Sequence, residues 1–264
     1  MKCDNILKFE RIFDYSPIAG VGFAGNIMIS INTLLSGNNK LWVDARDTIS
    51  CDDKSVNSWD VYFNQKYNYK ETSNIINSIN GYQDVIKYKA KYTHTDDLII
   101  KARSLFYDNF EIKKWILDDV NSYYELNINN KITLACQIRL GDMFKNHNTA
   151  NINTYENRIK EILIENPEIE QIFLATDDDL AIDYLKDKFT IPIIYQNNIY
   201  RESSDDPYKR VFNDRDNHNT NMCKEVLIDI ILLGMCKYFL SADVSSVSTV
   251  AMVFSKNIEK TYHI

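Results

Sequence analysis

The second half of the chain alternates short apolar runs with amphipathic runs, and no other feature of the sequence constrains the fold as strongly. Strands that alternate with helices of about 10–15 residues predict a parallel sheet with helices on both faces. The predicted strands are 131–140, 171–176, 192–196 and 238–242, and the predicted helices are 154–166, 177–189, 221–235 and 245–255.

The first half shows a weaker version of the same pattern. We expect a charged strand within 6–16, a helix over 26–36, a buried strand over 40–47 and mainly helix from 96 to 125. The polar, Asn-rich run that begins at Glu125 is the predicted boundary. The sequence therefore predicts two domains, 1–126 and 127–264.

Composition excludes several classes of protein. The net charge of -7 argues against general binding to nucleic acid. The longest apolar stretch, Ile230 to Cys236, is far shorter than the ~20 residues that a membrane-spanning helix needs. Five cysteines without a CxxC pair indicate free thiols in a reducing compartment. We therefore expect a cytoplasmic protein without an integral membrane segment.

In open parallel sheets, ligands bind outside the carboxyl ends of the strands, so the residues after each predicted strand matter most. The first strand of the second half ends in Gln137, Arg139, Gly141 and Asp142. The planar fork of Arg139 can hold a diphosphate through two parallel hydrogen bonds and offset the charge of a leaving phosphate. An ion pair with a neighbouring carboxylate is the structural alternative.

The next strand ends in Thr176, Asp177, Asp178 and Asp179. Aspartate is a preferred N-cap, so we expect at least one of these carboxylates to begin the following helix. Another carboxylate can accept hydrogen bonds from a nucleobase or ribose. Asp177 and Asp179 also form a D-x-D pair, but acidic residues are common at helix starts, so we expect no metal site.

The last predicted strand leads into a helix start rich in hydroxyl groups: Ser245, Ser246, Ser248 and Thr249. Free backbone N–H groups and the positive end of the helix dipole bind phosphate, and hydroxyls add donors. A simple serine N-cap is the structural alternative. Together with Arg139 and the aspartates, this helix start predicts a nucleotide-diphosphate pocket at one edge of one sheet.

These stretches resemble the motifs of a known family. QIRLGD, from Gln137, resembles the H-x-R-x-G/T-D motif of the GT-B fucosyltransferases, which include the α1,2- and α1,6-, nodulation and protein O-fucosyltransferases. IFLATDDD resembles their second motif and CKYFLSADVSSVSTVAM their third, while WVDARD followed by SWDVYFNQ is similar to their N-terminal "VD…N-x-W-E-Y-Y-F" segment.

The resemblance implies an α/β, GT-B-like fold with two Rossmann-like domains whose parallel sheets face a central cleft. It implies an inverting glycosyltransferase that moves fucose from GDP-fucose to a carbohydrate or glycoconjugate acceptor and requires no cofactor or metal. Residues 1–126 would then be the acceptor side and 127–264 the nucleotide-sugar side. Arg139 would contact the diphosphate, Asp177 or Asp178 would help to read guanine, and Ser245, Ser246 and Ser248 would line the phosphate site.

The sequence departs from the family pattern at three places. Gln137 replaces the usual histidine and cannot gain a positive charge. Leu140 stands where the α1,6 members have a second arginine. His147 takes the place of their proposed general base, a glutamate. A histidine can deprotonate an acceptor hydroxyl at neutral pH, and a solvated loop histidine is the alternative.

Two other functions compete with this interpretation. Gly20, Gly22 and Gly25 form a G-x-G-x-x-G followed by Asp44, a pattern typical of NAD(P)-dependent oxidoreductases. In a transferase, these glycines would instead line the cleft. The third hypothesis is a non-catalytic relative that binds a nucleotide or glycan, which Gln137 favours. The aromatic residues Trp42, Trp59 and Tyr62 can stack on an acceptor sugar, although we expect most aromatic side chains to pack in the core.

Overall fold

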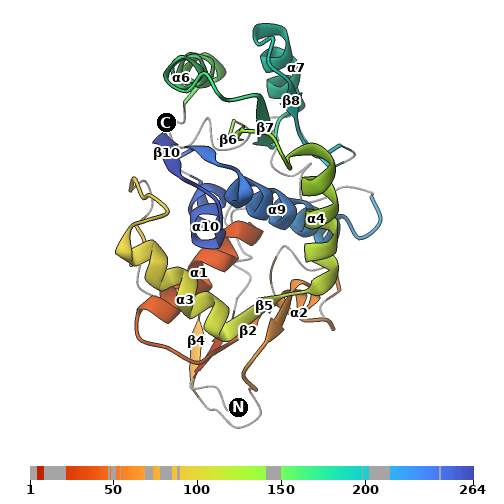
Figure 1. The fold of residues 1–264 in the computed structure, drawn as a ribbon. Coiled ribbons are helices and arrows are strands. Elements are labelled where there is room, and N and C mark those ends of the chain that lie inside the picture. Colours follow the sequence, from red (N-terminus) through yellow and green to blue (C-terminus); the bar gives the residue numbers. More distant parts are fainter. Residues whose placement is uncertain are drawn as a thin grey trace.

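The structure contains two parallel sheets and a short antiparallel ribbon, with helices packed around them (Figure 1). It is a computed structural model of the 264-residue chain. The described residues are 5–8, 22–46, 48, 52–53, 55–68, 74–77, 85–87, 90–140, 150–197, 199–201, 215–243 and 245–264.

The second half forms a five-stranded sheet in which all described pairings are parallel. All six residues of each of the two central strands, β6 and β7, are buried, as the continuous apolar runs predict for a sheet covered on both faces. Across the sheet the order is β10 (Lys260–His263), β9 (Tyr238–Ser241), β6 (Thr133–Ile138), β7 (Gln171–Thr176) and β8 (Ile193–Ile194).

The helices of the second half cover both faces of this sheet. One face packs against α6 (Ile152–Glu165) and α7 (Asp179–Lys188), and the other packs against α9 (His218–Met235) and α10 (Ser246–Phe254). α9 and α10 approach so closely at Gly234 that a Cβ atom there would lie 2.9 Å from the Ala251 carbonyl oxygen.

The first half forms a smaller parallel sheet of order β2–β1–β4. A two-stranded antiparallel ribbon, β3 with β5, lies beside it. These elements are β1 (Asn5–Lys8), α1 (Phe23–Leu35), β2 (Leu41–Asp44), α2 (Ser58–Tyr62), β3 (Phe63–Gln65), β4 (Ile75–Asn77), α3 (Asp97–Asn109), β5 (Phe110–Ile112) and α4 (Lys114–Asn127).

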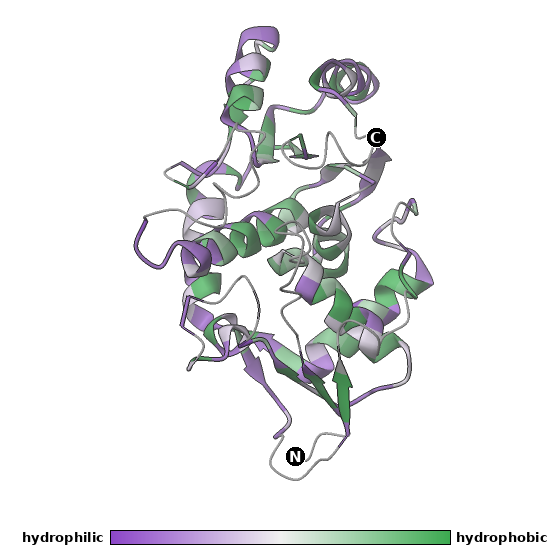
Figure 2. Cartoon of the chain, turned by 180° about the vertical axis from the view of Figure 1, so that it is seen from behind, coloured by the Kyte–Doolittle hydropathy of each residue, from purple (hydrophilic) through white to green (hydrophobic). Residues whose placement is uncertain are grey.

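α9 and α10 lie in the middle of the molecule, between the large sheet and the helices of the first half (Figure 1). Both helices contact α1, α10 also contacts α3, and α9 contacts α4. The second half of α9 is apolar and buried, whereas its first turns are polar (Figure 2). One apolar cluster therefore joins residues from both halves of the chain.

Two polar contacts fix α9 and α10 against the first half. Asp52 accepts hydrogen bonds from the backbone N–H groups of Asn219 and Thr220 at the start of α9, at 3.2 and 2.8 Å. Arg103 donates to the carbonyls of Val253 and Met252 at the end of α10, at 2.8 and 2.9 Å. Satisfying the free groups at helix ends in this way sets the position of both helices.

The sequence predicted the second half more accurately than the first. Each predicted strand and helix of 131–255 has a counterpart within a few residues. The prediction missed β10 and β4, which are short and lie at the edges of their sheets. The predicted helical region 96–125 is two helices that β5 separates, and 58–65 divides into α2 and β3.

Candidate functional site

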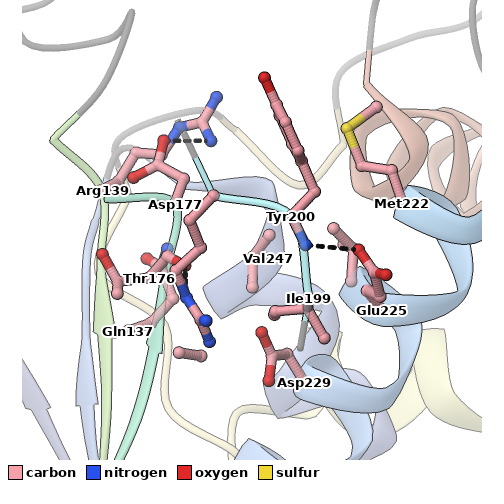
Figure 3. A pocket seen from close by; sticks show the side chains of 13 residues that line it. Gln137, Arg139, Thr176, Asp177, Ile199, Tyr200, Met222, Glu225, Asp229 and Val247 are labelled. Carbon is pink, nitrogen blue, oxygen red and sulfur yellow. Dashed lines mark hydrogen bonds and ion pairs between the residues drawn. The ribbon is translucent and has the colours of Figure 1, made fainter. Parts of the chain in front are cut away.

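A pocket opens at the carboxyl edge of the large sheet, where the sequence predicted one (Figure 3). It contains about 640 Å³ of empty space, part of it continuous with solvent. The lining residues lie at the ends of β6 and β7 or just after them, between β8 and α9, on α9, and in the first turn of α10: Gln137, Arg139, Ala175, Thr176, Asp177, Ile199, Tyr200, Arg201, Met222, Glu225, Val226, Asp229 and Val247.

Arg139 and Asp177 form an ion pair at one end of this pocket. Nη1 of Arg139 lies 2.6 Å from Oδ2 of Asp177, and their side chains are 27% and 16% exposed. The register aligns Ile138 with Thr176, so the next residues, Arg139 and Asp177, leave the sheet at the same level. Asp177 also accepts a hydrogen bond of 3.3 Å from the N–H of Leu140. The carboxylate therefore orients the guanidinium without removing it from the pocket.

Gln137 is held in place by Ser248, deep beside the pocket. Both residues are buried, and the Ser248 hydroxyl donates to Oε1 of Gln137 at 3.2 Å. The same hydroxyl accepts from the N–H of Ala242 at 3.0 Å. The Gln137 side chain is thus fixed against the first turn of α10, and Ser248 connects the ends of β6 and β9 rather than lining the pocket.

The first turn of α10 adjoins the pocket through Val247. Ser245 occupies the N-cap position and is buried, but its side chain makes no capping hydrogen bond. Ser246 begins the helix and is partly exposed. Helix N-termini of this kind attract anions through their free N–H groups and dipole, so this turn and Arg139 can act on the same phosphate.

The other predicted carboxylates have different surroundings. Asp178 is the N-cap of α7, where Oδ1 accepts a hydrogen bond of 2.9 Å from the N–H of Leu180. Its N–H donates to the hydroxyl of Thr176. Asp178 does not line the pocket, whereas Thr176 and Asp177 do.

Asp229 is a pocket residue that the sequence reasoning missed. Its carboxyl group points into the pocket at the end opposite Arg139 (Figure 3). Oδ1 accepts a hydrogen bond of 2.6 Å from the side-chain amide of Gln196, and no described residue donates to Oδ2. Burial raises the pKa of Asp229 to about 7, although Gln196 and the charge of Arg201 offset part of that effect. The sequence feature that could have pointed to Asp229 is its place as a single acidic residue within the apolar run VLIDIILLG.

Arg201 brings a second guanidinium to the pocket, and no pattern in the sequence marked it. Its side chain is only 3% exposed. Nε donates to the carbonyl of Thr176 at 3.2 Å and Nη2 donates to that of Gln196 at 2.9 Å. Because Leu140 replaces the second arginine of the α1,6 members, the sequence predicted one positive charge fewer in the pocket. The structure supplies a second arginine, Arg201, from a segment distant in sequence.

The segment that carries Arg201 is anchored to α9. The N–H of Tyr200 donates to Oε2 of Glu225 at 3.2 Å, and Arg215 pairs with the same carboxylate. The Tyr200 ring packs edge-to-face on His218, with centroids 4.7 Å apart. These contacts hold Tyr200 and Arg201 at the pocket wall.

Solved structures with the same overall fold are fucosyltransferases. The chain superposes on the fucosyltransferase NodZ from Bradyrhizobium with a TM-score of 0.55 and 12% identity, over 95% of this chain and 92% of NodZ. NodZ α1,6-fucosyltransferase crystallised with GDP gives a TM-score of 0.57 at 12% identity, over 97% and 93%. POFUT1 with GDP gives 0.53 at 8% identity, over 100% and 98%.

The chain has the fold of these fucosyltransferases. The predicted GT-B-like α/β class and the resemblance inferred from the motifs are confirmed at the level of the fold. No protein-family model and no curated protein sequence matches the chain.

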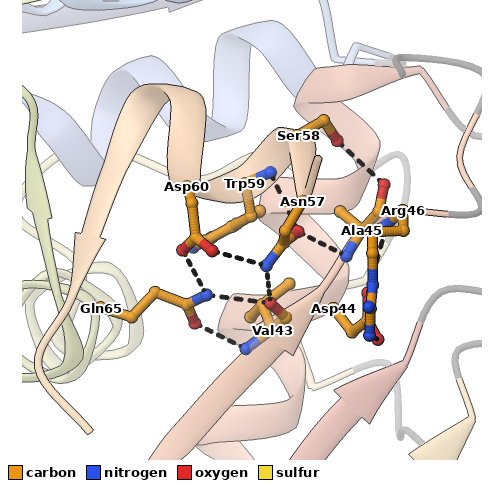
Figure 4. A network of polar contacts seen from close by, with 9 residues as sticks. All are labelled: Val43, Asp44, Ala45, Arg46, Asn57, Ser58, Trp59, Asp60 and Gln65. Atoms are coloured by element: carbon orange, nitrogen blue, oxygen red, sulfur yellow. Dashed lines mark hydrogen bonds and ion pairs between the residues drawn. The ribbon is translucent and has the colours of Figure 1, made fainter. Parts of the chain in front are cut away.

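Within this fold, the segment that resembles the N-terminal fucosyltransferase motif is structural (Figure 4). Oδ1 of Asn57 accepts from the N–H of Ala45 at 2.8 Å, and its amide donates to the carbonyl of Val43 at 2.8 Å. Gln65 pairs with both backbone groups of Val43, at 2.7 and 3.0 Å. The two side chains complete the hydrogen bonding along β2.

The first-half aromatic residues also belong to the core. Trp59 and Tyr62 are fully buried, and Trp42 is 9% exposed. The ring of Trp59 packs on that of Phe63, with centroids 4.6 Å apart, and Tyr62 donates to the carbonyl of Thr220. The predicted core role is observed, and these rings are not available to stack on an acceptor sugar.

The glycine pattern gives the oxidoreductase alternative little support. β1 ends at Lys8 and α1 begins at Phe23, with Gly22 as its N-cap and Gly25 inside the helix. The carboxylate of Asp44 accepts from Nε and Nη2 of Arg46 at 2.9 and 2.5 Å, so an arginine occupies the group that would bind a ribose.

Some predicted residues lie outside the described part of the chain: Gly20, Gly141, Asp142 and His147. Within the described part, no helix is long and apolar enough to cross a membrane. In the same residues, no group of three or more His, Cys, Asp or Glu side chains is arranged to hold a metal ion.

Proposed function

We propose that this chain is an inverting glycosyltransferase that takes a sugar from a GDP-sugar, with GDP-fucose as the donor. The observation that carries the proposal is the pocket itself, with Arg139 at one end, Asp229 at the other and Val247 of the first turn of α10 between them. That arrangement matches a ligand with an anionic part and a hydrogen-bonding base. The shared fold with enzymes crystallised with GDP and GDP-fucose supports the same donor.

In this proposal the diphosphate lies between Arg139 and the first turn of α10. The Arg139 fork donates to phosphate oxygens and stabilises the negative charge that grows on GDP as the sugar leaves. The backbone N–H groups at the start of α10, from Ser246 onward, face the same charge. An acceptor hydroxyl attacks the anomeric carbon from the face opposite GDP, so the configuration inverts.

The guanine lies at the other end and donates to Asp229. Asp177 is paired with Arg139 and Asp178 begins α7, so Asp229 is the pocket carboxylate whose second oxygen meets no donor among the described residues. A carboxylate accepts from both N1–H and the C2 amino group of guanine, whereas adenine offers no such pair. This assignment replaces the expectation that Asp177 or Asp178 reads the base.

The proposal predicts that GDP binds more tightly at pH 8 than at pH 6. The guanine donors favour the ionised form of Asp229, so binding lowers a pKa that is about 7 in the empty pocket and releases a proton. Calorimetry in buffers of different ionisation enthalpy measures that release.

Calorimetry with GDP, UDP, ADP and NAD, with Mg²⁺ and with EDTA, tests the donor class. We expect binding of GDP alone, unaffected by EDTA. Binding of NAD without GDP would establish the oxidoreductase alternative. GDP binding without release of GDP from GDP-fucose, with or without sugar acceptors, would establish a non-catalytic relative.

The variant D229N tests the base assignment by a change of specificity. Xanthine carries a carbonyl where guanine has its C2 amino group, and the Asn amide can donate to that oxygen. We expect D229N to lose about tenfold in affinity for GDP, roughly 1.4 kcal/mol, and to gain affinity for xanthosine diphosphate. A carbohydrate or glycoconjugate acceptor, the cytoplasmic location and independence of metal stay predictions.

A further inference from the structure

A second polar cluster stands at the same edge of the large sheet, beyond the start of α10. Nδ1 of His263, at the end of β10, lies 2.6 Å from Oδ1 of Asp243, which follows β9. Their side chains are 16% and 11% exposed. Because an ionised carboxylate only accepts, the Nδ1–H of His263 donates to it, and Nε2 carries the lone pair of the ring.

The registers place His263 at the same level of the sheet as Gln137, which lines the pocket. His263 pairs with Ser241, and Cys136 pairs with Leu240, so His263 is level with Gln137 two strands away. Two strand spacings amount to about 10 Å. The first turn of α10, which holds Gln137 through Ser248, lies between them.

His263 also faces the side of the sheet on which the pocket lies. Tyr262 and Ile138 belong to the outer apolar cluster with α6 and α7. Since side chains alternate along a strand, their neighbours His263 and Arg139 both point to the opposite face.

Two residues of the first half reach this cluster. Nζ of Lys91 lies 3.7 Å from Oδ2 of Asp243, and Nδ1 of His94 lies 3.4 Å from the hydroxyl of Thr261. The cluster therefore occupies the seam between the two halves. In a two-domain transferase, an acceptor reaches the donor sugar through such a seam.

We propose that His263 is the general base of the transfer reaction and that Asp243 positions it. The inference rests on the proposed function. The acceptor oxygen forms a bond to the anomeric carbon, and the bond from that carbon to the GDP phosphate oxygen breaks, with its electron pair leaving on GDP. The hydroxyl proton moves to Nε2 of His263, and the carboxylate of Asp243 stabilises the resulting imidazolium.

The test follows the hydrolysis of GDP-fucose, in which water is the acceptor and released GDP is measured. We expect H263Q to lower turnover about 100-fold or more, the usual contribution of a general base, and to leave GDP affinity within about twofold. Glutamine can still donate to Asp243 but cannot take up the proton. The wild-type rate falls at acidic pH, and H263Q lacks that dependence.

Two further variants separate chemistry from packing. D243N should lower turnover by a smaller factor and move the acid limb of the rate profile to lower pH, because the imidazolium loses its counter-ion. H94Q alters a histidine of the same seam outside the proposed chemistry and should keep the wild-type turnover.

The outcomes distinguish the two proposals. Wild-type turnover with an unchanged rate in H263Q overturns the assignment of the base and leaves the transferase function intact. A wild type that binds GDP but releases none from GDP-fucose overturns both proposals. Loss of GDP affinity in H263Q together with turnover indicates a structural role and overturns the base assignment.

Discussion

Polar side chains lie beside the edge strand β2 and beyond the ends of the central strands β6 and β7, and the two sets make different contacts. Around β2, the polar side chains of Asn57 and Gln65 bond to backbone groups (Figure 4). After β6 and β7, Arg139 and Asp177 face a pocket (Figure 3). The difference follows from the position of each strand in its sheet.

β2 has a strand neighbour on one side in the described sheet, so its other backbone edge needs partners that side chains supply. β6 and β7 have neighbours on both sides, and their backbone groups are already paired. Polar residues beyond their ends therefore stay available for a ligand. Polar side chains therefore complete the backbone hydrogen bonding at the sheet edge, whereas at the sheet centre they line a pocket.

The largest expected effect is that of R139A on turnover. Loss of the guanidinium should reduce turnover by roughly 10²–10³, about 3–4 kcal/mol of transition-state stabilisation. The free energy of unfolding should change by less than about 1 kcal/mol, because the ion pair with Asp177 is partly exposed. R139K should also be impaired, since a point charge lacks the fork. Unchanged kinetics in R139A would contradict the proposed role of Arg139 in the reaction.

The variant N57A should lower the stability of the fold and leave ligand binding unchanged. It leaves the buried N–H groups of Ala45 and Trp59 without the side-chain oxygen that they share, at about 1–3 kcal/mol each. We expect the free energy of unfolding in urea to fall by about 3 kcal/mol. GDP affinity of the folded fraction should match the wild type, and a selective loss of binding would contradict a structural role.

The variant D229N should show how much the buried carboxylate of Asp229 lowers the free energy of unfolding. The pKa of Asp229 rises from 3.8 to about 7 on folding, so its contribution is fully favourable below pH 4 and is lost as pH rises through 7. D229N removes that penalty. It should be more stable than the wild type by a few kcal/mol at pH 8, and the difference should vanish toward pH 4. Parallel stability curves across this range would contradict the raised pKa.

The smallest effect is expected for D178A. Removal of the N-cap of α7 should lower the free energy of unfolding by about 1 kcal/mol. GDP affinity should not change, because Asp178 does not line the pocket. A marked loss of affinity in calorimetry would restore Asp178 as a base-reading residue.

The structure confirms the parts of the prediction that depend on neighbours in sequence. The uninterrupted apolar run of β7 and the amphipathic pattern of α6 are local signals, and both elements are observed. β10, with the sequence KTYH, was missed because a four-residue edge strand with three basic or polar residues carries no clear alternation. The polar start of α9, from His218, also hid three residues of that helix.

The candidate site was only partly predictable for the same reason. Arg139 and Asp177 meet because parallel strands present their carboxyl ends at one edge, a rule that applies before any packing is known. Asp229 and Arg201 reach the pocket only because α9 packs across the sheet and the segment before it is fastened to Glu225. No local pattern encodes those contacts.

By itself the sequence determined the class of fold, the edge of the sheet where a ligand can bind and the arginine at that edge. Hydrophobic periodicity and strand direction are local properties, so a chain read residue by residue contains them. Tertiary structure decided which polar groups support β2 and which of them face the pocket. It also brought His263 to Asp243 and Asp229 to Gln196. Such meetings depend on how elements far apart in sequence pack, since burial and hydrogen bonding are settled only when the whole core closes.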